Sequence, residues 1–143
     1  MKRDDIIDAI VVRMETIRIG NGYLTDAGKN VERDRVAEMD PTEDYLIDVT
    51  AGAWETEDTA PGAVRRWMNV TVAFACRGTD AIDIRDNLLT DVVQATYTDL
   101  TWGGLAILSE ETGGAADKDY ADDLYAWGEL DMRVLYDTVE GEI

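Results

Sequence analysis

Two segments of the chain repeat their apolar residues with the period of an α-helix. The first runs from Asp4 to Ile17, and its carboxylates at Asp4 and Asp5 suit the positive end of a helix dipole. The second runs from Asp80 to about Thr98. The inner stripes predicted for the two helices are Ile6, Ile7, Ile10, Val11, Met14 and Ile17, and then Ile84, Leu88, Val92 and Ala95.

Other apolar positions alternate with small or polar ones, as in strands that have one face in a core. The clearest strand runs from Arg66 to Arg77, and Met68 lies on its apolar face. Further strands are predicted at residues 45–50, 105–108 and 124–137, with a short extended piece at 30–35 and an exposed loop at a hairpin tip at 52–62. This order predicts one α+β domain over residues 1–143, in which a mixed or mainly antiparallel sheet carries both helices on one face.

The composition indicates a globular protein with an acidic surface. Asp and Glu number 31 against 13 Lys and Arg, so the formal net charge is -18, while 45% of the residues are hydrophobic. This charge opposes binding to nucleic-acid phosphates. It fits either a salty habitat or a protein that must repel a polyanion, and both interpretations stay open. The most apolar run, residues 70–76, is far shorter than the about 20 residues that span a bilayer, so no membrane partner is expected.

Candidate chemistry is sparse. The chain has no His, which removes the commonest general base and metal ligand. Cys76 ends an apolar strand and is predicted to be a buried structural thiol. The acidic segment 117–123 offers oxygen ligands but lacks EF-hand spacing, so a solvated loop is predicted. We therefore assign no catalytic, cofactor-binding or metal-binding residue and expect no enzyme, with an acidic cation-binding protein, an enzyme or a DNA mimic as alternatives from other classes.

Two tryptophans are candidates for an interface, because large aromatic side chains anchor many protein contacts. Trp67 falls on the side of its strand opposite Met68, and Trp54 lies in the acidic stretch predicted to be a loop. The candidate interface residues are Trp54, Glu55, Glu57, Asp58, Arg65, Arg66 and Trp67.

One string of residues resembles a known family. After the first helix the chain reads Gly-Tyr-Leu-Thr-Asp-Ala-Gly at residues 22–28, followed by Glu-Arg-Asp-Arg at residues 32–35. This resembles the tail terminator (tail completion) proteins of long-tailed bacteriophages and related phage-like particles. The order of the later elements, up to the C-terminal strand that includes residues 133–138, is also similar, so the resemblance covers most of the chain.

The resemblance implies a non-enzymatic virion protein that forms a homo-oligomeric, hexameric ring at the head-proximal end of the tail tube. Its partners would be the tail tube protein and the head-tail connector or neck protein, and DNA would pass through the lumen without specific binding. It would be assembled in the host cytoplasm and reside in the virion tail. Residues 22–28 are expected to form a structural turn, and residues 52–62 a ring or tube contact. The alternative within this class is another phage neck or head-tail joining protein.

Overall fold

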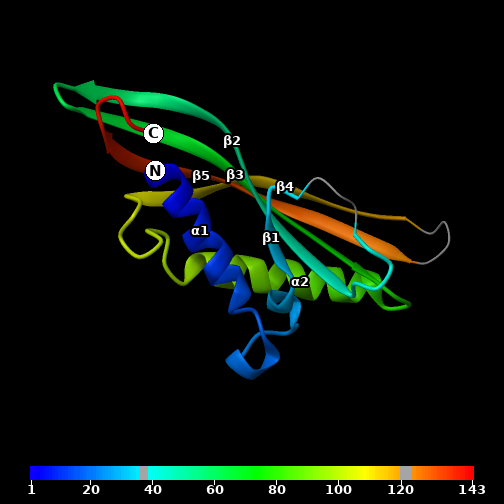
Figure 1. Ribbon diagram of the computed structural model, residues 1–143. Coiled ribbons are helices and arrows are strands. Elements are labelled where there is room, and N and C mark those ends of the chain that lie inside the picture. Colours follow the sequence, from blue (N-terminus) through cyan, green and yellow to red (C-terminus); the bar gives the residue numbers. More distant parts are fainter. Residues whose placement is uncertain (36–38, 120–123) are drawn as a thin grey trace.

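Five strands form one mixed sheet in the computed structural model of the protein, which describes residues 1–35, 39–119 and 124–143 (Figure 1). Their spatial order is β1-β2-β3-β5-β4. β1 pairs with β2 in parallel, and every other neighbouring pair is antiparallel. The bounds are β1 (Val31–Arg33), β2 (Tyr45–Ala60), β3 (Ala63–Arg77), β4 (Leu108–Asp119) and β5 (Tyr125–Val139).

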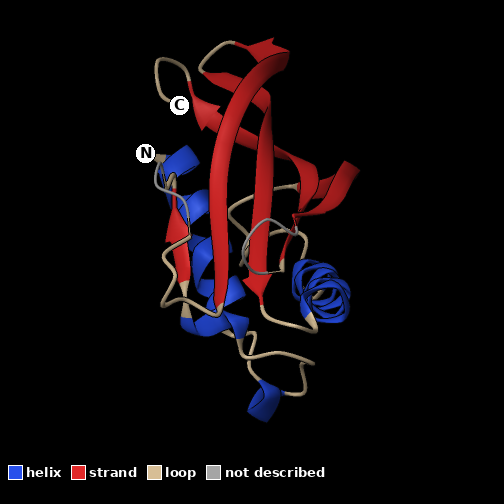
Figure 2. Cartoon of the chain, turned by 90° about the vertical axis from the view of Figure 1, so that its right-hand side faces the viewer, coloured by secondary structure: helices blue, strands red, loops and turns tan. Residues whose placement is uncertain are grey.

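Both helices lie on the same face of this sheet, which confirms the predicted α+β architecture (Figure 1). They are α1 (Lys2–Glu15) and α2 (Ala81–Tyr97), and two short 3₁₀ turns, η1 (Ile19–Asn21) and η2 (Ala27–Lys29), follow α1. Figure 2 shows α2 nearly end on and α1 from the side, so the two helices cross steeply. Among the described residues, neither helix is long and apolar enough to cross a membrane. The sheet face away from the helices is called the open face below.

The core lies between the helices and the sheet, as the apolar stripes predict. Ile10 of α1 and Val92 of α2 are fully buried, and Val72 of β3 meets them from the sheet side within the same cluster. Each large aliphatic side chain buried in this way contributes about 1.5–3 kcal/mol to folding. Ile17 is also fully buried although it lies just beyond the end of α1.

The prediction of a loop at residues 52–62 is wrong. β2 continues to Ala60 and β3 already begins at Ala63, so only Pro61 and Gly62 turn the chain. Gly62 has φ +83°, which a residue without a Cβ adopts easily. The acidic composition suggested a loop, but the backbone here is satisfied by pairing with β3, which is itself supported by β5. The acidic side chains of this stretch need only to face solvent, and β2 is exposed here.

The predicted strand at residues 105–108 is also wrong, because β4 begins at Leu108 and continues to Asp119. Gly113 and Gly114 lie inside it next to a β-bulge. A Cβ on Gly114 would stand 2.5 Å from the carbonyl oxygen of Glu129, so the missing side chain permits close strand pairing there.

Candidate assembly surface

The candidate interface residues all lie on the hairpin extension, residues 52–67, formed by the end of β2 and the start of β3. β2 is exposed at every position from Gly52 to Ala60. Figure 1 shows this hairpin running past the N-terminal end of α1. The extension therefore projects beyond the helix layer, where side chains on both of its faces can reach solvent or another molecule.

The two tryptophans of the extension point to opposite faces. Trp67 lies on the open face, because its neighbour Met68 is fully buried on the helix side, as predicted. Trp54 pairs with Met68 across β2 and β3 and therefore shares the helix side, where it is 50% exposed. The structure thus places the two rings back to back rather than together.

An arginine from another element covers each ring. The guanidinium carbon of Arg133 in β5 lies 3.9 Å from the ring centroid of Trp67, and that of Arg3 in α1 lies 5.8 Å from the ring centroid of Trp54. Both are cation–π contacts. Arg133 also donates two hydrogen bonds to Oε2 of Glu110 in β4, at 2.9 and 2.7 Å. Sequence reasoning missed both arginines as partners, because the pairing of β3 with β5 that brings Arg133 next to Trp67 is not visible in the sequence.

The arginines and the acidic residues of the extension differ in their contacts. Arg65 donates two hydrogen bonds to Asp137 on the open face, at 2.8 and 3.0 Å, and this contact lowers the pKa of Asp137. Arg66 donates to the hydroxyl of Thr138 on the helix side. Glu55, Glu57 and Asp58 are exposed, and the Asp58 carboxylate accepts a hydrogen bond from the backbone N–H of Thr59 at 2.8 Å. Arg65 and Arg66 thus connect the extension to β5, while the acidic residues face solvent.

A second ordered feature is the loop that carries the family-like string. Asp91 of α2 is fully buried, and its carboxylate accepts hydrogen bonds from the backbone N–H of Leu24 at 2.9 Å and of Thr25 at 2.8 Å. The Thr25 hydroxyl donates a third, at 2.7 Å. Three donors on one buried carboxylate fix the loop to α2. Sequence reasoning missed Asp91, although its position three residues after Leu88 and four before Ala95 of the predicted inner stripe was a signal.

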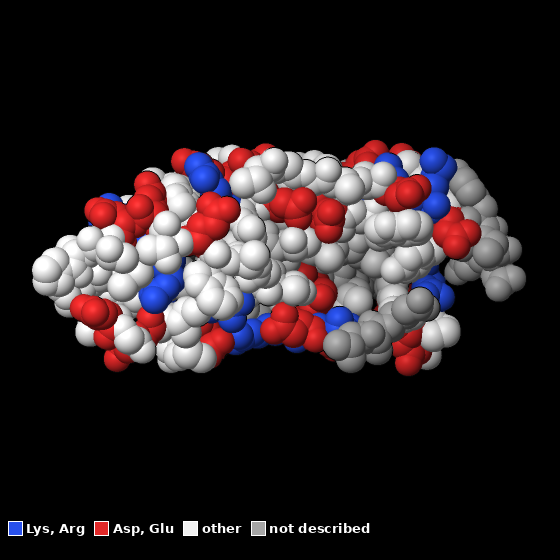
Figure 3. Space-filling model, turned by 90° about the horizontal axis from the view of Figure 1, so that it is seen from above, with Lys and Arg blue, Asp and Glu red and all other residues white. Residues whose placement is uncertain are grey.

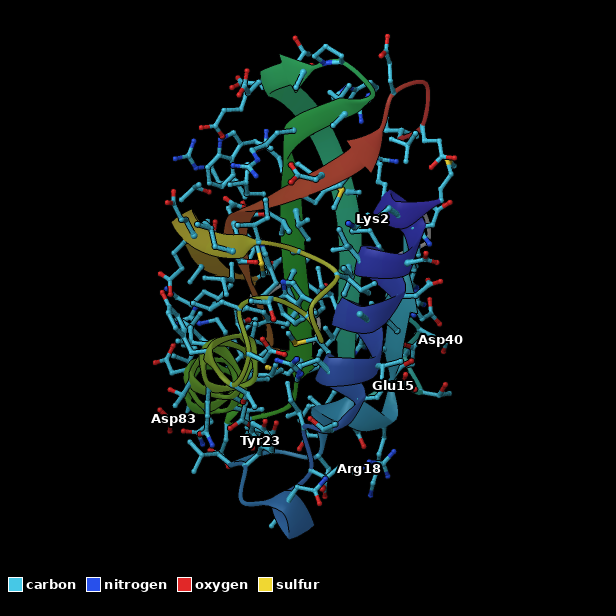
Figure 4. All side chains as sticks on the ribbon, turned by 90° about the vertical axis from the view of Figure 1, so that its left-hand side faces the viewer. Lys2, Glu15, Arg18, Tyr23, Asp40 and Asp83 are labelled. Atoms are coloured by element: carbon cyan, nitrogen blue, oxygen red, sulfur yellow. The ribbon has the colours of Figure 1, made fainter. Side chains whose placement is uncertain are left out.

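The rest of the string connects α1 to the sheet. Asp26 accepts a hydrogen bond from the N–H of Ile19 at 3.0 Å. A Cβ on Gly28 would lie 2.6 Å from the carbonyl oxygens of Glu15 and Ile17, so only glycine fits this crossing. The expected structural turn is therefore present. Figure 4 shows Arg18 and Tyr23 in this loop, which projects beyond the end of α1.

The predicted structural role of Cys76 is confirmed. The residue is fully buried, and its thiol donates a hydrogen bond to the carbonyl oxygen of Ala81 at 3.2 Å. Burial raises the pKa of the thiol to about 11, so it stays protonated near neutral pH and is a poor nucleophile.

The acidic segment 117–123 is only partly described. Asp117 and Asp119 belong to β4 rather than to a loop, while Asp122 and Asp123 lie outside the described residues. The Asp117 side chain accepts a hydrogen bond from the N–H of Lys118 at 2.8 Å. Within residues 1–35, 39–119 and 124–143, no three His, Cys, Asp or Glu side chains gather in a way that could hold a metal ion.

Two comparisons with known proteins found no match. No protein-family model matches the chain, and no curated protein matches it either. Functional inference therefore rests on the string at residues 22–28 and on the surfaces described above.

Proposed function

We propose that the protein is a structural component of a phage tail or phage-like particle, forming a hexameric ring at the head-proximal end of the tail tube. There it ends tube polymerisation and provides the docking face for the head connector. The observation that carries this proposal is the hairpin extension, which reaches past the helices with one tryptophan on each face.

Two tryptophans and two arginines of the extension belong to the residue types that are enriched at interfaces. Aromatic residues and arginine are enriched where proteins meet, and half of the surface of Trp54 is open to solvent. Its two faces can engage two different neighbours. A subunit in a ring needs this arrangement, because it contacts the next subunit and also the tube or the connector.

Two further features agree with this function. The string at residues 22–28, which resembles tail terminators, is a rigid connection between α1 and the sheet. The net charge of -18 suits a passage that DNA crosses without being bound, because carboxylates repel phosphates and retain their own hydration. The proposed partners are therefore further copies of the chain, the tail tube protein and the connector.

Electron microscopy of the purified protein, alone and mixed with polymerising tail tube protein, tests this proposal. Six-fold rings and tubes of limited length are expected. Trp54→Ala should weaken ring formation or tube capping, while Tyr97→Ala, which removes an equally exposed aromatic side chain at the end of α2, should not. A monomer that leaves tube length unchanged would contradict the proposal. Binding to the connector without any effect on tubes would indicate another neck protein instead.

A further inference from the structure

The loop of residues 18–26 holds two apolar side chains in solvent on a rigid support. Ile19 is 59% exposed and Leu24 is 54% exposed. The buried carboxylate of Asp91 holds the backbone of this loop at Leu24 and Thr25. Because the loop is ordered before any partner arrives, docking it loses little conformational entropy. Apolar side chains on a preformed support are suited to anchor an interface.

The open face of the sheet contains a hollow of about 340 Å³. Its walls include Leu46, Tyr125 and Trp127, and the ring centroids of Tyr125 and Trp127 are 5.2 Å apart. Ala73 and Ala75 of β3 keep the hollow deep because their side chains are small. A dry cavity of about 150 Å³ accommodates a benzene molecule, so this hollow has room for two branched aliphatic side chains.

The charges around the loop and the hollow are complementary. Asp48 and Glu129 line the hollow, and so does Arg35, whose guanidinium pairs with Glu43 at 2.8 Å and with Glu32 at 3.5 Å. The carboxylates therefore outnumber the single cation around the hollow. Arg18 begins the loop, and Lys29 follows it and pairs with Asp26 of the loop at 3.8 Å, so residues 18–29 carry two basic side chains and one acidic one. Opposite charges at the rim of an apolar contact favour encounter and fix its register. In a chain with 31 acidic residues, residues 18–29 are therefore suited to contact the acidic rim of the hollow.

We infer that Ile19 and Leu24 of one copy insert into the open-face hollow of a second copy. The loop projects on the helix side, whereas the hollow lies on the open face seen in Figure 3. Two copies therefore cannot each place their loop in the other's hollow at the same time. The contact is head-to-tail, and such contacts close into rings when the rotation permits. It is one of the interfaces that the proposed ring requires and so rests on that proposed function.

Cross-linking between two separately prepared chains tests the contact directly. One chain carries Leu24→Cys and the other carries Ala73→Cys, while the native Cys76 stays buried and unreactive. Under mild oxidation the mixture should give a disulfide-linked dimer that neither chain gives alone. Val12→Cys replaces Leu24→Cys as the control, because Val12 is an equally exposed apolar residue on α1. No dimer in the mixture, or as much dimer with the control, overturns the inference.

Sedimentation of single-site variants of the full chain provides the second measurement. Leu24→Asp should weaken self-association at least about tenfold, since it removes a buried aliphatic anchor, while Val12→Asp should not. Arg18→Glu should weaken association, and adding Glu129→Arg to it should restore part of the loss. Rings that persist with Leu24→Asp would refute this contact and leave the proposed ring standing. The specific cross-link without closed rings would support the contact and count against the ring.

Discussion

The buried carboxylate of Asp91 makes a sharp prediction, because it is the point at which the loop of residues 18–26 is attached to α2. Replacing it by Asn keeps the size of the side chain and removes the charge. The carboxylate receives the N–H of Leu24 on one oxygen and both donors of Thr25 on the other. An amide has only one acceptor oxygen, so in either orientation its NH₂ group faces a backbone N–H.

The expected loss follows from this geometry. One backbone N–H, either the buried one of Thr25 or the partly buried one of Leu24, is left without its acceptor, which costs about 1–3 kcal/mol. The hydrogen bonds that remain lose the assistance of the charge and fall from about 1.5–3 to about 0.5–1.5 kcal/mol each. Removing a buried charge also removes its desolvation penalty, which offsets part of this loss. We expect Asp91→Asn to lower the free energy of unfolding by about 2–4 kcal/mol.

Urea unfolding at fixed salt measures this loss. With a slope near the middle of the usual range of about 1–3 kcal/mol per molar urea, the midpoint should fall by about 1–2 M. Asp83→Asn is the matched control, since it removes the same charge from an exposed position in the first turn of α2 and should cost at most about 1 kcal/mol. Hydrogen exchange should accelerate at Leu24 and Thr25 in Asp91→Asn only. Equal midpoints for the two variants would refute the assigned role of Asp91.

Three further changes test other parts of the structure. Gly28→Ala places a Cβ against two backbone carbonyl oxygens and should cost about 1–3 kcal/mol in urea unfolding; an unchanged midpoint would show that the crossing relaxes. Glu43 has its pKa lowered from 4.5 to about 2, first by its hydrogen bonds with Arg35, so its contribution to stability is full above about pH 4.5 and is lost toward about pH 2. The stability difference between wild type and Glu43→Gln should shrink over that window, and a constant difference would contradict the assignment. Arg133→Ala should cost about 0.5–1 kcal/mol and raise acrylamide quenching of Trp67, and quenching equal to wild type would show that the ring is not covered.

Features that depend on one segment alone could be predicted from the sequence, and features that depend on pairing between distant segments could not. Periodicity located both helices and assigned Met68 and Trp67 to opposite faces of β3, because side-chain direction follows from local backbone geometry. Residues 52–60 look like a loop until β3 and β5 support them. The role of Gly114 is visible only in the paired strands, where the carbonyl oxygen of Glu129 lies 2.5 Å from the place that its Cβ would take. Asp91 belongs to the site only because the loop folds back onto α2.

The structure also bears on the charge of -18, since carboxylates occupy both faces of the molecule. Figure 3 shows them along the open face, where Glu129 and Asp131 alternate with the buried Leu130. On the helix side, α1 presents Asp5 and Asp8 to solvent. In a ring only the surfaces that line the passage act on DNA, so repulsion of DNA accounts for one part of the charge and hydration of the outer surface must account for the other.

Bringing six such subunits together requires screening, and the Debye length falls from about 10 Å at 0.1 M salt to about 3 Å at 1 M. Ring formation should therefore strengthen over that range, whereas an interface built mainly on ion pairs would weaken.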